Sequence, residues 1–366
     1  MKDKLSQVSL FRGIAIIAIA LFHSAYSFNL SPIVGAVPNI GHAGCQAFFV
    51  LSAFCLCISY EDKELKYASY FKRRFIAIAS GYWITISINL LMDIISSKLL
   101  GHSIYSVHKE PITIISNFLL ANGLFPSYRI LDGLFRGGWF VGTLMIMYLI
   151  FPALRKAYFW NNEKWRMIRF WCFPLTIFVL SSTIMIVSGK NQQTFCELGS
   201  IKYHSIFNQI TSFSLGFTLY DLSKHHRGSQ LKNALFGLMP LVLAAFLFYS
   251  PQIKVSAIIA PTLIALFTLY EYSAFNYKFL YDSKISRYLC KIGDMSFAVF
   301  LCHFWVTSLV LEPFHHYIKT QLPSINENIL YLCSLPVILI IIYFVSILYH
   351  KLIQANKSFL NLVFQK

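Results

Sequence analysis

Two residues of the first apolar segment, Arg12 and His23, have the spacing of a pair on one face of a helix. Eleven residues at about 100° each make three turns plus about 20°, so both side chains point the same way, about 16.5 Å apart along the axis. Arg12 would then lie at one mouth of a membrane and His23 near its middle, where an ionisable group usually faces a cavity or a partner. Taken singly, Arg12 also fits a topology anchor and His23 a packing residue.

A second histidine, His303, lies in the late apolar segment GDMSFAVFLCHFWV, at a depth similar to that of His23. Two histidines at one depth can flank one site, although His303 also fits a buried hydrogen bond between helices. Ser52, in GHAGCQAFFVLSAF, would add a hydroxyl inside the membrane, on a segment whose small residues also suit close helix packing. The candidate catalytic residues are His23, His303 and Ser52.

A basic cluster precedes the third apolar segment and, together with Arg12, has the chemistry to hold phosphate groups, because guanidinium forks match phosphate oxygens. Such clusters are also ordinary topology signals. The predicted residues for an anionic donor are Arg12, Lys72, Arg73 and Arg74.

Paired glycines and a tryptophan stand before the fourth apolar segment. The glycines allow close approach, and the indole suits either a sugar ring or the membrane interface. The predicted acceptor-binding residues are Arg136, Gly137, Gly138 and Trp139. The cysteines and histidines show no metal-ligand spacing, so no metal is expected.

The composition defines the elements that must position these residues. Of 366 residues, 57% are hydrophobic and only 13% are charged, and the mean hydropathy is +0.59. A soluble domain is about one-quarter charged, so soluble, disordered and fibrous classes are excluded. The 8 cysteines lie mostly in apolar runs without a disulfide framework. We expect an all-α, polytopic membrane protein.

About 20 apolar residues cross the hydrocarbon as a helix, and ten segments qualify. A shorter run, Pro111 to Phe125, is about half a span; it is interpreted as a re-entrant or interfacial element, with a full span as the alternative. The ten candidates are 13–28, 43–60, 75–96, 139–154, 170–188, 204–222, 234–250, 255–271, 292–311 and 328–349.

The distribution of Lys and Arg sets the orientation. With ten spans and both termini cytoplasmic, 23 of the 31 Lys and Arg fall inside and eight outside, as the positive-inside rule requires. The net charge of +16 is then explained by topology and anionic lipid rather than by nucleic acid. We expect a membrane domain over residues 1–350 and a short basic cytoplasmic tail over 351–366.

Five elements in this order resemble acyltransferase family 3, a family of integral membrane acyltransferases. Arg12 and His23 match its R-x10-H pattern, and FFVLSAF from Phe48 resembles its FFVLSGF element. KRRF, the Trp-led helix WFVGTLMIMYLIFPAL and a late Ser–His element resemble the other three. The late element is carried by Ser296 and His303. The chain departs from the family pattern at Gln46, Ala53, Ala77, Ser80, Leu144 and Met145.

The resemblance implies transfer of an acyl group, usually acetyl, from cytoplasmic acyl-CoA to a hydroxyl of a cell-envelope polysaccharide, such as exopolysaccharide or lipopolysaccharide, or of a lipid-linked sugar. Acetyl-CoA would be a substrate, with no permanently bound cofactor, and the location would be the bacterial inner membrane. His23 would act as general base or carry the acyl group itself. His303 and Ser52 would orient it or stabilise an oxyanion.

Two other classes fit parts of the pattern. A transporter or flippase for an amphipathic anion would line its path with Arg12 and the histidines, but would move substrate without breaking a thioester. A membrane scaffold would show no acylation phenotype when His23 is replaced.

Overall fold

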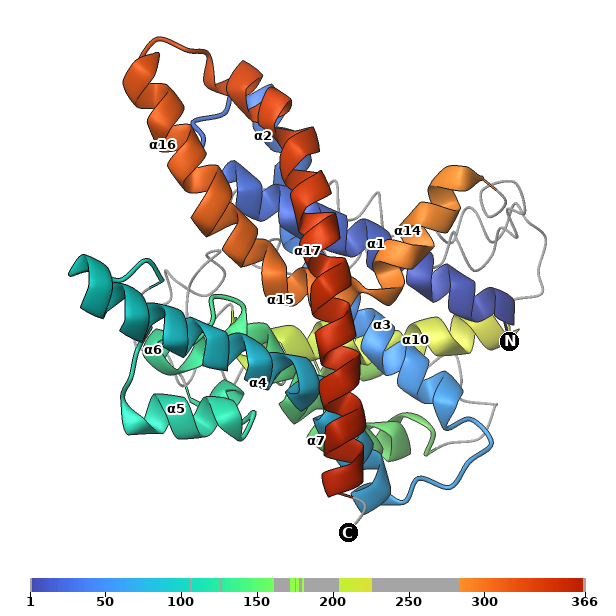
Figure 1. The fold of residues 1–366 in the computed structure, drawn as a ribbon. Helices are drawn as coiled ribbons and strands as arrows, with labels where there is room; N and C mark the ends of the chain where they lie inside the picture. Colours follow the sequence, from blue (N-terminus) through green and yellow to red (C-terminus); the bar gives the residue numbers. More distant parts are fainter. Residues whose placement is uncertain are drawn as a thin grey trace.

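The computed structural model describes residues 2–105, 107–125, 127–160, 172–174, 176, 177, 180, 204–225 and 283–364. Within these ranges every regular element is a helix and no strand occurs, as expected for an all-α protein (Figure 1). The elements are α1 (Lys2–Ala25), α2 (Pro32–Asn39), η1 (Ile40–Ala43), α3 (Gly44–Ser59), α4 (Tyr67–Leu100), α5 (Pro111–Phe118), η2 (Asn122–Leu124), α6 (Tyr128–Leu131), α7 (Gly138–Tyr158), α10 (Ile206–His225), α14 (Lys284–Asp294), α15 (Ser296–Val306), η5 (Thr307–Leu311), α16 (Glu312–Gln321) and α17 (Glu327–Val363).

Six helical segments of the described part are long and apolar enough to cross a membrane. They correspond to six of the ten predicted spans, and α10 lies at a seventh, 204–222. The predicted spans 234–250 and 255–271, and most of 170–188, fall outside the described residues. The number ten and the orientation of the termini therefore stay predictions. The six segments are Gln7–Ala25, Pro32–Ser59, Tyr67–Leu100, Gly138–Tyr158, Ser296–Gln321 and Glu327–Val363.

The short apolar run beginning at Pro111 does not cross the membrane. Its helix α5 has eight residues, about 12 Å, against a hydrocarbon core of about 30 Å. Two buried asparagines attach the run to its surroundings: the Asn117 amide donates to the carbonyl of Ile130 (2.9 Å), and the Asn122 amide to that of Gly138 (2.9 Å). The hydroxyl of Tyr82, on α4, donates to Asn117 Oδ1 at 2.5 Å. The full-span alternative is therefore excluded for this run.

The late segment predicted as one span over 292–311 is divided. Helix α14 ends at Asp294 and α15 begins at Ser296, with Met295 between them. Glycines bring α14 against α1: a Cβ on Gly13 would stand 2.1 Å from the Leu289 carbonyl oxygen, and one on Gly293 would stand 1.7 Å from that of Ser9. This close crossing of backbones positions α15 beside the second half of α1 (Figure 1).

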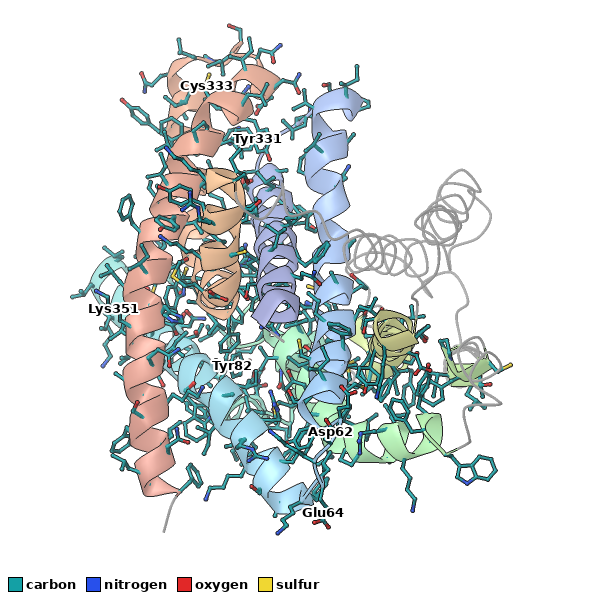
Figure 2. The ribbon with its side chains drawn as sticks, turned by 90° about the vertical axis from the view of Figure 1, so that its right-hand side faces the viewer. Asp62, Glu64, Tyr82, Tyr331, Cys333 and Lys351 are labelled. Carbon is teal, nitrogen blue, oxygen red and sulfur yellow. The ribbon has the colours of Figure 1, made fainter. Side chains whose placement is uncertain are left out.

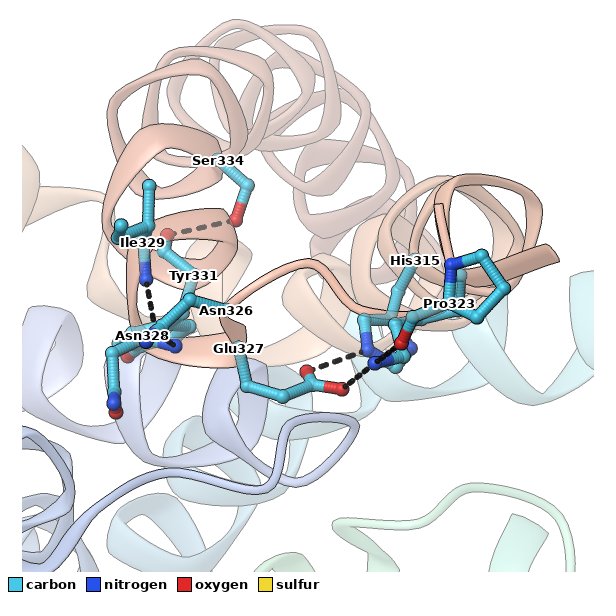
Figure 3. Close-up of polar contacts among 9 residues, drawn as sticks. His315, Pro323, Asn326, Glu327, Asn328, Ile329, Tyr331 and Ser334 are labelled. Atoms are coloured by element: carbon cyan, nitrogen blue, oxygen red, sulfur yellow. Dashed lines mark hydrogen bonds and ion pairs between the residues drawn. The ribbon is translucent and has the colours of Figure 1, made fainter. Parts of the chain in front are cut away.

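Helix α17 crosses the whole structure and extends beyond residue 350, so that most of the segment expected as a tail continues the helix. Its 37 residues rise about 55 Å. The Asn326 side chain accepts from the backbone N–H groups of Asn328 (2.9 Å) and Ile329 (3.3 Å), which caps its start (Figure 3). At its other end Lys72, from α4, donates to the Phe364 carbonyl. Figure 2 shows Tyr331 and Cys333 near one end of the bundle and Asp62 and Glu64 near the other.

Helices α16 and α17 are joined by a small polar cluster. Glu327 Oε2 lies 2.9 Å from His315 Nε2, and Glu327 Oε1 lies 3.0 Å from Lys319 Nζ (Figure 3). The Tyr331 hydroxyl donates to the Leu21 carbonyl at 3.2 Å, which connects α17 to α1. These contacts tie α17 to α16 and to α1, the helix that carries His23.

Candidate active site

The structure brings the two predicted histidines together. The rings of His23, on α1, and His303, on α15, lie with centroids 5.3 Å apart. The Phe304 ring packs against both, at 4.4 Å from His23 and 4.1 Å from His303. His303 is completely buried, whereas His23 is partly exposed. His303 is therefore the enclosed member of the pair, and His23 is the more accessible one.

The hydrogen bonds of His303 define which of its nitrogens carries the proton. Its Nδ1 lies 2.8 Å from the Phe300 carbonyl oxygen and 3.2 Å from that of Val299. Carbonyl oxygens only accept, so Nδ1 is the donor and Nε2 holds a lone pair. Nε2 is buried and has no hydrogen-bond partner among the described residues. A buried acceptor in this state costs about 1–3 kcal/mol, a cost that a donor from a ligand would remove.

A cavity of about 210 Å³ contains two more predicted residues, Arg12 and Ser52. Its polar lining comes from these two side chains together with Tyr148, Asp294 and Ser296, and the rest of the wall is apolar. Phe300 belongs to this wall and lies 5.9 Å from the His303 ring, centroid to centroid. His303 therefore contacts a residue of the cavity wall, while neither histidine is itself among the lining residues. The lining residues are Arg12, Phe48, Ser52, Ala77, Ile78, Phe140, Leu144, Tyr148, Asp294, Ser296, Phe297 and Phe300.

The predicted basic cluster divides between different contacts. Arg74 lies 6.0 Å from the ring centroid of Tyr148, a cavity residue, and its Nε is buried without a partner in the described part. Arg73 donates to the Tyr60 hydroxyl at 2.8 Å, and Lys72 contacts the end of α17. Arg12 lies near α3, with Nη2 3.7 Å from the Cys55 sulfur. Arg12 and Arg74 are thus the members associated with the cavity.

Two of the predicted acceptor residues, Gly137 and Gly138, are buried in tight packing. A Cβ on Gly137 would stand 2.7 Å from Phe300 Cζ, and one on Gly138 would stand 2.4 Å from the Leu131 carbonyl oxygen. Arg136 is exposed and forms an ion pair with Glu312 at 3.6 Å. The absence of a side chain at Gly137 therefore lets Phe300 pack against the backbone, and its absence at Gly138 lets the Leu131 carbonyl do the same.

Trp139 is 8% exposed, and its ring centroid lies 4.5 Å from that of His204. Its backbone N–H donates to Asp132 Oδ1 at 2.9 Å. Burial raises the pKa of the Asp132 carboxyl well above its usual range, with the backbone N–H groups of Trp139 and Gly138 acting in the opposite direction. Asp132 therefore anchors the start of α7, where Trp139 lies.

Sequence reasoning missed three residues of this region: Asp294, Tyr148 and Phe300. Asp294 accepts from the Ser9 hydroxyl at 2.5 Å and lies in the cavity wall. As an acidic residue at the edge of an apolar run, it was the one most open to prediction. Tyr148 and Phe300 resemble ordinary core residues in the sequence. Among the described residues, no group of three or more His, Cys, Asp or Glu side chains is arranged to hold a metal ion.

Fold and site together define a helical, multi-pass membrane protein with a histidine pair, one member of which is fully buried, near a cavity that Arg12 lines. The family model of acyltransferase family 3, described as an acyltransferase domain, matches residues 5–350, nearly the whole chain. The chain belongs to this family and is a membrane acyltransferase, as its motifs indicated. No curated protein and no solved structure shows significant similarity to it.

Proposed function

We propose that this protein is an O-acyltransferase that moves an acyl group, most often acetyl, from cytoplasmic acyl-CoA to a hydroxyl of an envelope polysaccharide or of a lipid-linked sugar in the inner membrane. The observation that carries the proposal is the contact of His23 with His303 beside a cavity that contains Arg12 and Ser52. The family supplies the class of reaction. The donor is inferred from the lining of the cavity, and the acceptor from the family resemblance.

The cavity suits the donor. Arg12 lines it, and Arg74 lies 6.0 Å from the ring centroid of Tyr148, a wall residue, so the donor phosphate nearest the thioester arm would gain charge-assisted hydrogen bonds there. Phe48, Ala77 and Leu144 form part of an apolar wall that fits a slender thioester arm. Ala77 and Leu144 stand where many family members carry charged residues, so this chain has a less polar wall. The thioester carbonyl would lie toward Phe300 and the histidines.

The reaction needs one proton acceptor and one proton donor. The acceptor hydroxyl oxygen attacks the thioester carbonyl carbon, and His23 takes the hydroxyl proton as general base, a role typically worth about 10²–10⁴-fold. The C–S bond then breaks, an ester forms, and the proton passes to the departing sulfur to give free CoA. Ser52, in the cavity wall, is available to donate a hydrogen bond to the oxyanion.

His303 would support the base rather than replace it. Its Nδ1 proton is held by two carbonyls of its own helix, which leaves Nε2 as an unpaired acceptor on a ring whose centroid lies 5.3 Å from that of His23. An acceptor there favours the protonated form of His23 that develops as the hydroxyl loses its proton. His303 is thus a positioning residue for His23.

The test is release of CoA from acetyl-CoA by the purified full chain in nanodiscs, with and without envelope glycan. We expect glycan to stimulate release and His23→Ala to reduce the stimulated rate by about 10²-fold or more. The matched control is His316→Ala, since His316 is an exposed histidine of α16, and it should keep the wild-type rate.

The other outcomes separate the rival functions. Release that is equal in wild type and His23→Ala would keep the acyltransferase and remove His23 from its chemistry. Absence of release with any acyl-CoA and a broad glycan extract, together with flux of an amphipathic anion into proteoliposomes, would replace the proposal by a transporter.

A further inference from the structure

One exposed face of α14 carries three cations that line a single pocket. Lys284, Arg287 and Lys291 surround it with Tyr288, and its volume is about 310 Å³. All four side chains are exposed. The ammonium of Lys291 lies 5.6 Å from the ring centroid of Tyr288. The pocket therefore combines positive charge with an aromatic ring.

None of these cations has an acidic partner among the described residues. The ion pairs of the described part involve other Lys, Arg and His side chains, and Arg73 and Lys72 of the predicted basic cluster bind Tyr60 and the Phe364 carbonyl. Like charges one turn apart on a helix repel each other, so three of them on one face favour an anion between them.

The register of α14 connects this pocket to the cavity. The opposite face, with Leu289 and Gly293, packs on α1. At about 100° per residue, Arg287, Lys291 and Asp294 fall within about 60° of one another. Asp294 lies in the cavity wall, about 10 Å along the axis from Arg287. The basic face therefore continues along α14 to Asp294, a residue of the cavity wall.

We propose that the basic face of α14 binds the phosphate groups of the adenosine nucleotide of acyl-CoA, an inference that rests on the proposed function. Arg287 would hold a phosphate with its guanidinium fork, Lys284 and Lys291 would add charge, and Tyr288 would offer a ring for adenine. The pantetheine arm would then run past Asp294 into the cavity. A phospholipid headgroup has the same phosphate chemistry, but the adjoining cavity favours the nucleotide.

Binding of adenosine 3′,5′-bisphosphate to the purified full chain tests the inference without turnover. In zwitterionic nanodiscs we expect the double variant Arg287→Gln/Lys291→Gln to bind it about five- to twentyfold more weakly than wild type, a range that allows for solvent exposure. The control is Lys351→Gln, because Lys351 is an exposed cation of α17 (Figure 2). It should bind like wild type.

Kinetics provide the second arm. The double variant should raise the KM for acetyl-CoA by a similar factor while kcat stays the same, and it should change the KM for 3′-dephospho-acetyl-CoA much less. Equal binding and equal KM in wild type and double variant would overturn the inference and leave the proposed function intact. A wild-type protein that binds the nucleotide but transfers no acyl group would overturn the proposed function and leave the binding site in place.

The lipid alternative has its own arm. The same variants are compared in nanodiscs of phosphatidylcholine alone and in nanodiscs containing phosphatidylglycerol. A defect of the double variant that is the same in both supports the nucleotide site. A defect that occurs only in anionic bilayers would assign the pocket to a lipid headgroup and overturn the inference.

Discussion

The ring of Phe300 lies 5.9 Å from the ring of His303, centroid to centroid, and forms part of the wall of the cavity that contains Arg12 and Ser52. Its ring also packs at 5.0 Å from that of Phe140, another residue of the cavity wall, and at 5.9 Å from that of Phe135. A thioester in the cavity would therefore meet Phe300 before it reaches the histidines. We therefore expect Phe300 to act as a barrier between the cavity and the histidine pair.

Replacement of Phe300 should uncouple thioester cleavage from transfer. Phe300→Ala opens a path for water from the cavity to the histidine pair, so we expect CoA release without glycan to rise several-fold and the stimulation by glycan to fall. The control is Phe297→Ala, which enlarges the same cavity at a position for which no ring contact with the histidines is found. An equal effect of both variants on glycan-independent release would refute the barrier.

The histidines should act as a unit. Since His303 is proposed to work through His23, the double variant His23→Ala/His303→Ala should be no slower than His23→Ala alone. If the two residues acted independently, the rate reductions of the single variants would multiply in the double variant. The measurement is the glycan-stimulated rate of CoA release for both single variants and the double variant. Thermal unfolding of each variant controls for loss of the fold. Multiplicative effects in folded variants would show that His303 acts separately.

A reciprocal glycine contact should limit stability. A Cβ on Gly142 of α7 would stand 2.4 Å from the backbone nitrogen of Gly123, and one on Gly123 would stand 2.5 Å from the Gly142 carbonyl carbon. Gly142→Ala should therefore destabilise the fold by about 1–3 kcal/mol, as overpacking does, and lower the Tm in detergent. Gly35→Ala is the control, because its Cβ would meet only Leu30 Cβ, at 3.6 Å. Equal Tm values for wild type and Gly142→Ala would contradict the close packing of Gly142 against Gly123.

Asp132 should make stability depend on pH. Burial raises the pKa of its carboxyl above the usual value, which is about 3.9, so the folded protein keeps the proton to higher pH than the unfolded chain. Its contribution to stability is fully present below about pH 4 and is lost as the pH rises through the folded-state pKa. Asp132→Asn keeps an oxygen for the N–H of Trp139 but cannot ionise.

We therefore expect Asp132→Asn to have a smaller drop in Tm between pH 5 and pH 8 than wild type. The control is Asp62→Asn, since Asp62 is an exposed acid of the loop before α4 (Figure 2). A wild-type drop in Tm that persists unchanged in Asp132→Asn would exclude this carboxyl as its source.

Much of the architecture was accessible from the sequence, because a membrane span is a local property. About 20 apolar residues must satisfy their backbone polar groups as a helix, and six described spans lie where hydropathy placed them. The pairing of Arg12 and His23 on one face followed from helical period alone. The family was also predictable, because its motifs are defined by residue types at fixed spacing within single segments.

The tertiary structure alone decided which distant residues meet. Whether His303 touches His23 depends on the break at Met295 and on the close crossing of α1 and α14 at Gly13 and Gly293. The division of the basic cluster, with Lys72 at the end of α17, also depends on contacts between helices far apart in the chain. Periodicity describes the face that a residue occupies, whereas the partner of that face is set by packing, which no local pattern encodes.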